Sequence, residues 1–330
     1  MKVLFVTSTR IGDAILTTGV LSYLLERYPQ ASFTVACGPL AAPLFPALPR
    51  LEQILLIHKR PYDLHWLELW AKCAPHRWDV VVDMRSSLLS FGLFARERHI
   101  YQRWHRSKGG HKVEQYGRVL RDPQETPNPR VWTTAEHHEK ARKLVPTGKP
   151  VIGFGPTTSW EGKQWPIPRY VELVKRLIAP DGMLPGARIA LFGTASEREI
   201  LRTIIDVIPP QDFVDIIGKG DLLTAAACLQ RCHFFIANDT GLMHLAAAAG
   251  VPTLGLFGPS RKEVYGPWGE CTGVAETAVP AEELISQIGR STGTLMESLP
   301  LETVEAAARA LWARCACQKS KGSPSWADNS

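Results

Sequence analysis

Residues 233–258 carry the clearest structural signal in the chain: His233-Phe-Phe-Ile-Ala-Asn-Asp-Thr-Gly-Leu-Met-His-Leu-Ala-Ala-Ala-Ala-Gly250, followed by Val251-Pro-Thr-Leu-Gly-Leu-Phe-Gly258. The pattern predicts a buried strand, a polar turn at 238–241, a helix of small residues and a second strand. Because the turn lies between a strand and a helix, the first N–H groups of the helix have no partner within it and carry a partial positive charge. Such a turn is typical of an anion site, most often a phosphate site. An ordinary strand–helix–strand unit with Asp239 as a helix cap would show the same pattern.

Strand and helix patterns alternate through the rest of the chain in two series. Short apolar runs, often β-branched, predict strands at 3–6, 33–36, 54–57, 80–82, 151–154, 189–192, 234–236 and 253–257. Helices are expected between them at 16–28, 64–73, 168–178, 196–207 and 222–232. This alternation is typical of α/β proteins with doubly wound parallel sheets, so we expect two Rossmann-like domains.

The domain limits are predicted from local composition. Pro146-Thr-Gly-Lys-Pro150 has the Pro and Gly content of a linker, which places an N-terminal domain at 1–148 and a C-terminal domain at 149–317. An amphipathic helix at 302–314 would cross back toward the first domain in this architecture. Residues 318–330 are rich in Lys, Ser and Pro and are expected to form a disordered tail.

The overall composition, with 45% hydrophobic and 21% charged residues, is that of a globular protein. The apolar segment after Lys2 is too short for a signal-peptide core, and the longest apolar run, 245–258, is interrupted by Gly250 and Pro252. We therefore expect a cytoplasmic protein. The seven cysteines lack the spacing of a zinc site or the density of a disulfide scaffold, so we expect reduced thiols and no bound metal.

The net charge is +6, and basic residues concentrate between positions 94 and 121. This run holds eight Lys and Arg and three His against two acidic residues, Glu97 and Glu114. Such a run attracts a polyanion or an anionic membrane surface, and a solvated basic face is the alternative. Because no helix-turn-helix, zinc-finger or aromatic stacking motif accompanies it, we do not expect nucleic acid as a partner.

Three motifs resemble those of one enzyme family. They are Asn238-Asp-Thr-Gly-Leu-Met-His-Leu-Ala-Ala-Ala-Ala-Gly250 with the Pro-Thr-Leu-Gly-Leu-Phe-Gly-Pro259 that follows, Arg10-Ile-Gly-Asp-Ala-Ile-Leu-Thr-Thr-Gly19, and Lys163-Gln-Trp-Pro166. They are similar to motifs of glycosyltransferase family 9, the heptosyltransferases that build the inner core of bacterial lipopolysaccharide. The resemblance implies a GT-B fold, in which two Rossmann-like domains face each other across a cleft. It also implies that the first domain binds the acceptor and the second binds the nucleotide sugar, without a cofactor.

The same resemblance implies the substrates. The donor would be ADP-heptose, and the acceptor would be an anionic, lipid-linked oligosaccharide whose acidic sugars and phosphates suit the basic run. A peripheral contact with the cytoplasmic face of the inner membrane is compatible with such an acceptor. A family member that uses another nucleotide sugar is the alternative.

Asp13 is the candidate general base. Inverting glycosyl transfer needs a carboxylate that removes the proton of the acceptor hydroxyl as its oxygen attacks the anomeric carbon. A position beside a helix N-terminus favours the charged form of such a group. From the residues alone Asp13 could equally cap a helix starting near Ala14; the resemblance favours catalysis.

The chain contains no Asp-x-Asp metal-binding motif. The charge of the leaving diphosphate must therefore be neutralised by protein donors at the candidate donor site. The resemblance assigns phosphate contacts to Lys163 and the hydroxyls of Thr158 and Ser159, although a solvated lysine and simple turn formers are the alternatives. It assigns ribose binding to Glu197, which could also be a helix cap. The remaining donor-site candidates share the turn and helix after the 234–236 strand: Asp239, Thr240, Gly241, Leu242 and His244.

Candidate acceptor residues are the arginines Arg60, Arg96, Arg98 and Arg103, because guanidinium groups pair bidentately with carboxylates. Each could equally be a surface arginine. Two rival classes of protein fit parts of the sequence. A nicotinamide-dependent dehydrogenase would fit Gly153-Phe-Gly155, but the third glycine of that fingerprint is absent. A non-catalytic polyanion-binding or lipid-glycan-binding protein would need the basic run but neither Asp13 nor Lys163.

Overall fold

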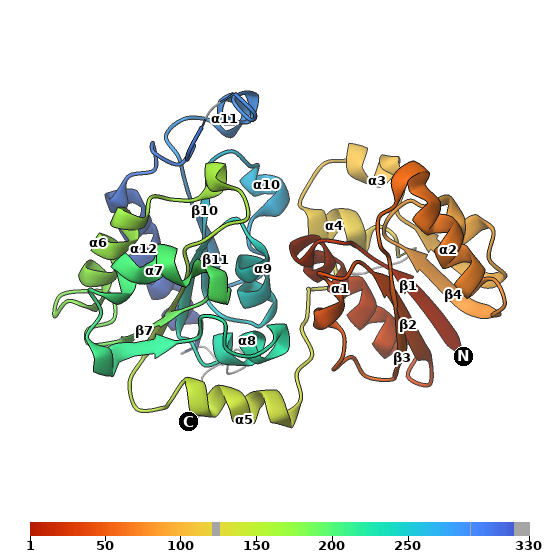
Figure 1. The fold of residues 1–330 in the computed structure, drawn as a ribbon, viewed down its shortest axis with the longest axis horizontal. Coiled ribbons are helices and arrows are strands. Elements are labelled where there is room, and N and C mark those ends of the chain that lie inside the picture. Colours follow the sequence, from red (N-terminus) through yellow and green to blue (C-terminus); the bar gives the residue numbers. More distant parts are fainter. Residues whose placement is uncertain (121–125, 291, 320–330) are drawn as a thin grey trace. The chain divides into compact units, whose positions relative to one another are not determined.

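The computed structural model describes residues 1–120, 126–290 and 292–319 (Figure 1). The chain divides into two compact units, residues 1–134 and residues 135–330, called unit 1 and unit 2 below. The expected domain limit at 148/149 falls 14 residues after this division. The reason is α5 (Ala135–Leu144), which packs against α8 (Leu222–Leu229) of unit 2.

Unit 1 is a five-stranded parallel sheet with helices around it. Its strand order is β3-β2-β1-β4-β5, in which the chain winds outward from β1 in both directions. The strands are β1 (Lys2–Val6), β2 (Ser32–Cys37), β3 (Leu51–Leu56), β4 (Trp78–Asp83) and β5 (Ala95–Ile100). The α-helices are α1 (Ile11–Arg27), α2 (Leu64–Cys73), α3 (Arg103–Ser107) and α4 (Lys112–Gly117), and the short 3-10 helices are η1 (Ala42–Leu44), η2 (Pro61–Asp63) and η3 (Leu88–Phe91).

The Thr17-Thr18-Gly19 end of the motif at residues 10–19 holds α1 against the last segment of unit 1. The Thr18 hydroxyl accepts a hydrogen bond from the Arg130 amide at 2.9 Å. A Cβ on Gly19 would lie 2.1 Å from the carbonyl oxygen of Pro127, so only glycine fits there. These motif residues therefore have a packing role in unit 1.

Unit 2 contains a six-stranded parallel sheet in the order β11-β10-β9-β6-β7-β8. The strands are β6 (Val151–Gly155), β7 (Arg188–Leu191), β8 (Phe213–Asp215), β9 (Phe234–Asn238), β10 (Thr253–Phe257) and β11 (Thr272–Glu276). Besides α5 and α8, the α-helices are α6 (Ile167–Ile178), α7 (Arg198–Ile205), α9 (Gly241–Ala248), α10 (Lys262–Tyr265), α11 (Ala281–Ser286) and α12 (Leu301–Lys319). The 3-10 helices are η4 (Glu161–Lys163), η5 (Ala195–Glu197) and η6 (Pro210–Asp212). In both units the order reverses beside the first strand, which is the Rossmann arrangement.

The final helix packs within unit 2. α12 contacts β10, β11 and α6, and its Val304, Ala308 and Leu311 belong to the hydrophobic core of that unit. It runs to residue 319, beyond the expected end at 314, and residues 318 and 319 of the expected tail are therefore helical. Residues 320–330 lie outside the described part of the chain, and the contact of this helix with the first domain stays a prediction.

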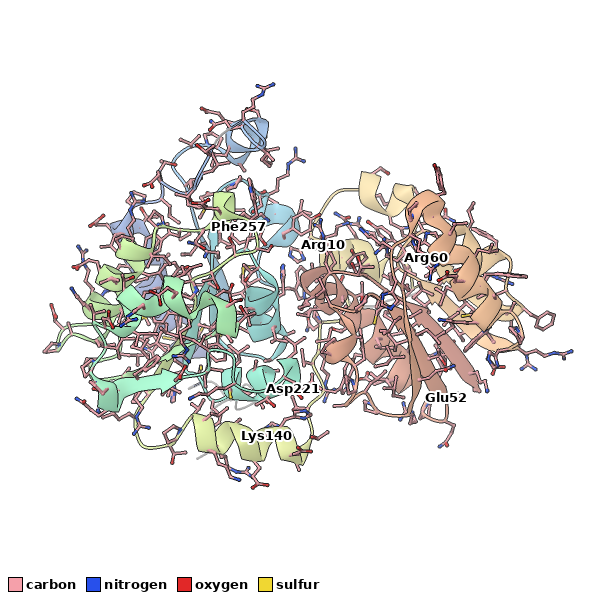
Figure 2. The ribbon with its side chains drawn as sticks, viewed as in Figure 1. Arg10, Glu52, Arg60, Lys140, Asp221 and Phe257 are labelled. Carbon is pink, nitrogen blue, oxygen red and sulfur yellow. The ribbon has the colours of Figure 1, made fainter. Side chains whose placement is uncertain are left out.

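The eight predicted strands are confirmed, and three strands were not predicted: β5, β8 and β11. The first helix begins at Ile11, five residues before the prediction, with Arg10 at its N-cap (Figure 2). Gly250 ends the α9 segment with a φ of +80°, the left-handed conformation expected there.

Candidate active site

Asn238, the last residue of β9, binds both ends of the loop between β6 and α6. Its side chain is fully buried. The carboxamide oxygen accepts a hydrogen bond from the Trp165 amide at 3.0 Å, and the amide nitrogen donates to the Pro156 carbonyl at 2.6 Å. Trp165 is itself fully buried and donates through Nε1 to the Leu299 carbonyl at 3.0 Å. The loop between β6 and α6, which carries Lys163, is thereby fixed to the end of β9.

Lys163, Asp239 and His244 converge at the start of α9. The Lys163 ammonium donates to a carboxylate oxygen of Asp239. The other oxygen lies 3.9 Å from Nε2 of His244, whose side chain is 6% exposed. The structure thus brings Lys163 to the turn that holds Asp239 and His244, and it pairs the Asp239 carboxylate with a cation, while Thr240 is the N-cap of α9.

The hydroxyl of Thr240 is positioned for a ligand at the same helix N-terminus. Thr240 is the N-cap of α9, but its side chain makes no capping hydrogen bond. Its Oγ1 atom is buried and has no hydrogen-bond partner within the described residues, and the same holds for Oγ of Ser260, which follows β10. Buried hydroxyls normally have a partner. Together with the N–H groups of Gly241 and Leu242, the Thr240 hydroxyl offers donors to an anion.

The other donor-site candidates lie on loops at the carboxyl ends of strands in unit 2. Thr158 and Ser159 follow β6; the Thr158 hydroxyl donates to the Trp160 carbonyl at 2.6 Å, and Ser159 is exposed. Glu197 lies in η5 after β7, where its carboxylate accepts hydrogen bonds from the Thr194 amide at 2.6 Å and the Thr194 hydroxyl at 2.8 Å. Glu197 therefore has a capping role in this structure; ribose binding stays a prediction.

Asp13 lies in the first turn of α1, after the loop at the carboxyl end of β1. It is partly exposed, and no hydrogen bond or ion pair of its carboxylate occurs among the described residues. The N-cap of α1 is Arg10, so the alternative that Asp13 is the N-cap of this helix is wrong. The carboxylate is consequently available to a substrate in unit 1.

A polar loop after β4 was not predicted as part of a site. β4 pairs with β1, and the Met84 amide donates to the Val6 carbonyl at 2.9 Å, so this loop lies beside the one that leads to Asp13. The fully buried Asp83 carboxylate accepts hydrogen bonds from the Arg85 and Ser87 amides and from the Ser87 and Ser90 hydroxyls, at 2.5–2.9 Å. The sequence signal for this loop was a carboxylate directly after the apolar 80–82 run, with serines four and seven residues later.

Among the described side chains, Arg60, Arg96 and Arg98 have different partners. Arg60 follows β3 and pairs with Glu68 at 3.0 Å (Figure 2). Arg96 and Arg98 lie on β5; Arg96 pairs with Asp79 at 3.4 Å, whereas the Arg98 guanidinium donates to three main-chain carbonyls of residues 90, 93 and 95. Arg103 begins α3. The Arg98 guanidinium therefore stabilises the β4–β5 connection.

Much of the basic run between 94 and 121 is also used locally. Arg118 donates to the carbonyls of His105 and Gly109 at 2.9 and 2.8 Å. The ammonium of Lys112 lies 5.3 and 5.1 Å from the centroids of two tyrosine rings, and that of Lys108 lies 5.0 Å from a tryptophan ring. Arg121 lies outside the described residues. These contacts tie several of the cations to unit 1 itself.

Within the described ranges, no group of three or more His, Cys, Asp or Glu side chains could hold a metal ion. No described helix is both long and apolar enough to cross a membrane.

Two Rossmann-like units, each with polar loops at the carboxyl ends of its strands, place the chain in the GT-B fold class. The model of glycosyltransferase family 9 (heptosyltransferase) matches residues 71–283. The chain therefore belongs to this family, and it is a glycosyltransferase.

Individual relatives agree with this assignment. Lipopolysaccharide heptosyltransferase 2 of Salmonella typhimurium is 24% identical over 309 residues, covering 81% of this chain and 85% of the relative. Lipopolysaccharide heptosyltransferase 1 of Pseudomonas aeruginosa is 26% identical over 299 residues, covering 82% of each chain. Among solved structures, a glycosyltransferase of family 9 from Veillonella parvula gives a TM-score of 0.77 at 21% identity, covering 94% of this chain and 97% of that chain. The E. coli ADP-heptose lps heptosyltransferase II gives 0.69 at 19% identity, covering 96% of this chain and all of that one.

Proposed function

We propose that this protein is an inverting, metal-independent heptosyltransferase that transfers heptose from ADP-heptose to the inner core of lipopolysaccharide or to a related anionic glycan. The names of the curated relatives support the reaction and acceptor class, and the E. coli structural neighbour is named for ADP-heptose. The observation that carries the proposal is the group at the start of α9: Lys163 held by Asp239, beside the buried, unpartnered Thr240 hydroxyl.

In this proposal the diphosphate of the donor binds at the N-terminus of α9. Lys163 and the first N–H groups of the helix supply the positive charge that the departing ADP requires. Thr158 and Ser159 add hydroxyl donors, Glu197 binds the ribose after release from its capping hydrogen bonds, and His244 lies against the sugar side of the diphosphate. Asp239 is then a positioning residue, because its carboxylate holds the lysine in place.

The reaction itself is a single displacement. Asp13 accepts the proton of an acceptor hydroxyl, the hydroxyl oxygen forms a bond to the anomeric carbon, and the bond from that carbon to the phosphate oxygen breaks with its electron pair passing to ADP. Arg60, Arg96, Arg98 and Arg103 stay the predicted contacts to an anionic, lipid-linked acceptor. Arg98 would have to give up its main-chain hydrogen bonds for this role, so Arg60 and Arg96 are the better placed pair.

The testing experiment measures ADP release and product formation with ADP-heptose, and with other nucleotide sugars, on a water-soluble, delipidated core acceptor. Activity should survive excess EDTA. Asp13→Asn should leave nucleotide binding intact and lower turnover about a hundredfold or more, as expected for loss of a positioned base. Near-normal turnover in that variant would remove Asp13 from the mechanism, and loss of activity in EDTA with recovery in Mg²⁺ would overturn the metal-independent scheme.

A further inference from the structure

Large apolar side chains are exposed together on one surface of unit 1. α2 buries His65, Leu69 and Cys73 but exposes apolar residues of its opposite side. A surface helix normally presents charged and polar residues there. With the residues from η3 and the turn after it, the set has exposed fractions from 39 to 84% and consists of Leu64, Leu67, Trp70, Leu88, Phe91 and Phe94.

These residues form a continuous surface, called the α2–η3 face. α2 packs against η3, and Trp70 donates through Nε1 to the carbonyl of Gly92 at 3.0 Å, directly after η3. The Phe94 ring lies 5.3 Å from the guanidinium of Arg77, which is near the end of α2. The large exposed apolar residues of unit 2 are fewer: Trp160 at the start of η4, Ile200 on α7, and Ile285 and Ile288 at α11.

Cations without acidic partners lie among the apolar residues of this face. The guanidinium of Arg85 lies 5.9 Å from the Trp66 ring on α2, and Lys72 is exposed at the end of that helix. In the part of the chain that the structure describes, Lys72, Arg77 and Arg85 form no ion pair. The neighbouring carboxylates are already engaged: Glu68 with Arg60 at 3.0 Å, Asp79 with Arg96 at 3.4 Å, and Asp63 with His65 at 3.9 Å.

The charge of the whole chain has the same asymmetry. Residues 1–134 contain 18 Lys and Arg against 11 Asp and Glu, whereas residues 135–330 contain 20 against 21. The positive charge of the protein is therefore carried by unit 1, where the α2–η3 face lies.

We propose that the α2–η3 face docks on a lipid bilayer whose surface carries anionic headgroups. The leucines and aromatic rings would enter the boundary between headgroups and acyl chains, and the unpaired cations would meet lipid phosphates. This deepens the proposed function and rests on it, since a lipid-linked acceptor is presented at such a surface. A second copy of this chain is a poorer occupant, because a two-fold contact would bring the unpaired cations of the two copies together.

The test uses the full chain and vesicles that contain no glycan, so it does not depend on sugar transfer. Binding is measured by sedimentation with phosphatidylcholine vesicles, with and without phosphatidylglycerol. We expect binding only with phosphatidylglycerol. Leu67→Ser with Phe91→Ser, and separately Lys72→Glu with Arg77→Glu, should each weaken it about tenfold or more. The matched controls in unit 2, Ile200→Ser with Ile288→Ser and Lys175→Glu with Arg202→Glu, should bind like the unaltered protein.

A second measurement uses tryptophan fluorescence and one aromatic-to-aromatic substitution. Brominated lipids in the phosphatidylglycerol vesicles should quench the tryptophan fluorescence of the protein, and Trp70→Phe should remove much of that quenching. The proposal is overturned if the protein does not bind, if it binds pure phosphatidylcholine equally well, or if the α2–η3 variants bind normally. Self-association that Leu67→Ser with Phe91→Ser abolishes, without vesicle binding, would instead assign the face to a second copy. Transfer to a water-soluble acceptor, measured in parallel, reports the proposed function separately.

Discussion

Asn238→Ala tests whether one buried side chain holds the loop that carries the candidate donor residues. The substitution removes the acceptor for the Trp165 amide and the donor to the Pro156 carbonyl, and both of these residues are buried. Each buried polar group left without a partner costs about 1–3 kcal/mol, so the free energy of unfolding of unit 2 should fall by about 2–6 kcal/mol. For a unit of this size, 1 kcal/mol corresponds to about 2–4 °C, which predicts a Tm lower by roughly 4–24 °C.

Urea unfolding and scanning calorimetry measure this loss of stability. Titration calorimetry measures the affinity for ADP. We expect weaker nucleotide binding by Asn238→Ala, because Lys163 lies on the released loop. Thr158→Ala is the matched control on the same loop. Its hydroxyl donates to the exposed Trp160, so its loss should cost less than about 1 kcal/mol of stability while still weakening nucleotide binding.

Two results would refute the reasoning. Stability of Asn238→Ala within about 1 kcal/mol of the unaltered protein would mean that packing of Trp165, and not the Asn238 bridge, fixes the loop. A clear loss of stability with unchanged ADP affinity would mean that this loop does not bind the nucleotide.

Two further predictions concern unit 2. Lys163→Ala should weaken ADP binding about tenfold or more, since a hydrogen bond to a charged group contributes about 1.5–3 kcal/mol. Asp239→Ala should also weaken it, and the double variant should bind no worse than Lys163→Ala; strictly additive losses would argue against positioning of the lysine by Asp239. Burial opposes ionisation of Asp221, the N-cap of α8. The hydrogen bond from the Thr224 amide and the charges of His137 and Lys140 outweigh this effect and lower the pKa of Asp221. Asp221→Ala (Asp221 is labelled in Figure 2) should therefore lower the free energy of unfolding by about 1 kcal/mol at neutral pH. This loss of stability should vanish as the pH falls through the lowered pKa, because only the ionised carboxylate contributes. Asp206→Ala is the control, and a loss of stability that is independent of pH would contradict the assignment.

The sequence predicted the strands at the centres of both sheets because these are buried on both faces and read as continuous apolar runs. β1 and β9 illustrate this, since nearly every residue of each is buried. The strands that were missed, β5, β8 and β11, all lie at sheet edges. β5 reads Ala-Arg-Glu-Arg-His-Ile, and β8 has only three residues, so neither carries an apolar signal.

The candidate site was predictable in part. The polar turn after β9 has a local pattern, and the resemblance to the family supplied roles for Lys163 and Asp13. The contact of Lys163 with Asp239 joins residues 76 positions apart, and no local pattern encodes it. The bridge made by Asn238 depends on how the β6–α6 loop folds over β9, which is a tertiary property. The local contacts of Arg98 and Arg118 likewise use main-chain carbonyls, so the charge run alone could not show that these cations are engaged.

We expect the two units to attract anions by different physical means, so the salt dependence of the two affinities should distinguish them. Unit 2 has nearly balanced charge, so its candidate donor site depends on Lys163 and on backbone dipoles at the start of α9, which act at hydrogen-bond distance. Unit 1 has an excess of Lys and Arg over Asp and Glu, and the attraction of such net charge is screened over about 8–10 Å at ordinary ionic strength. Rising salt should therefore lower the affinity for an anionic acceptor or vesicle much more steeply than the affinity for ADP. Equal salt dependence of the two affinities would mean that net charge, and not the local geometry at α9, governs donor binding.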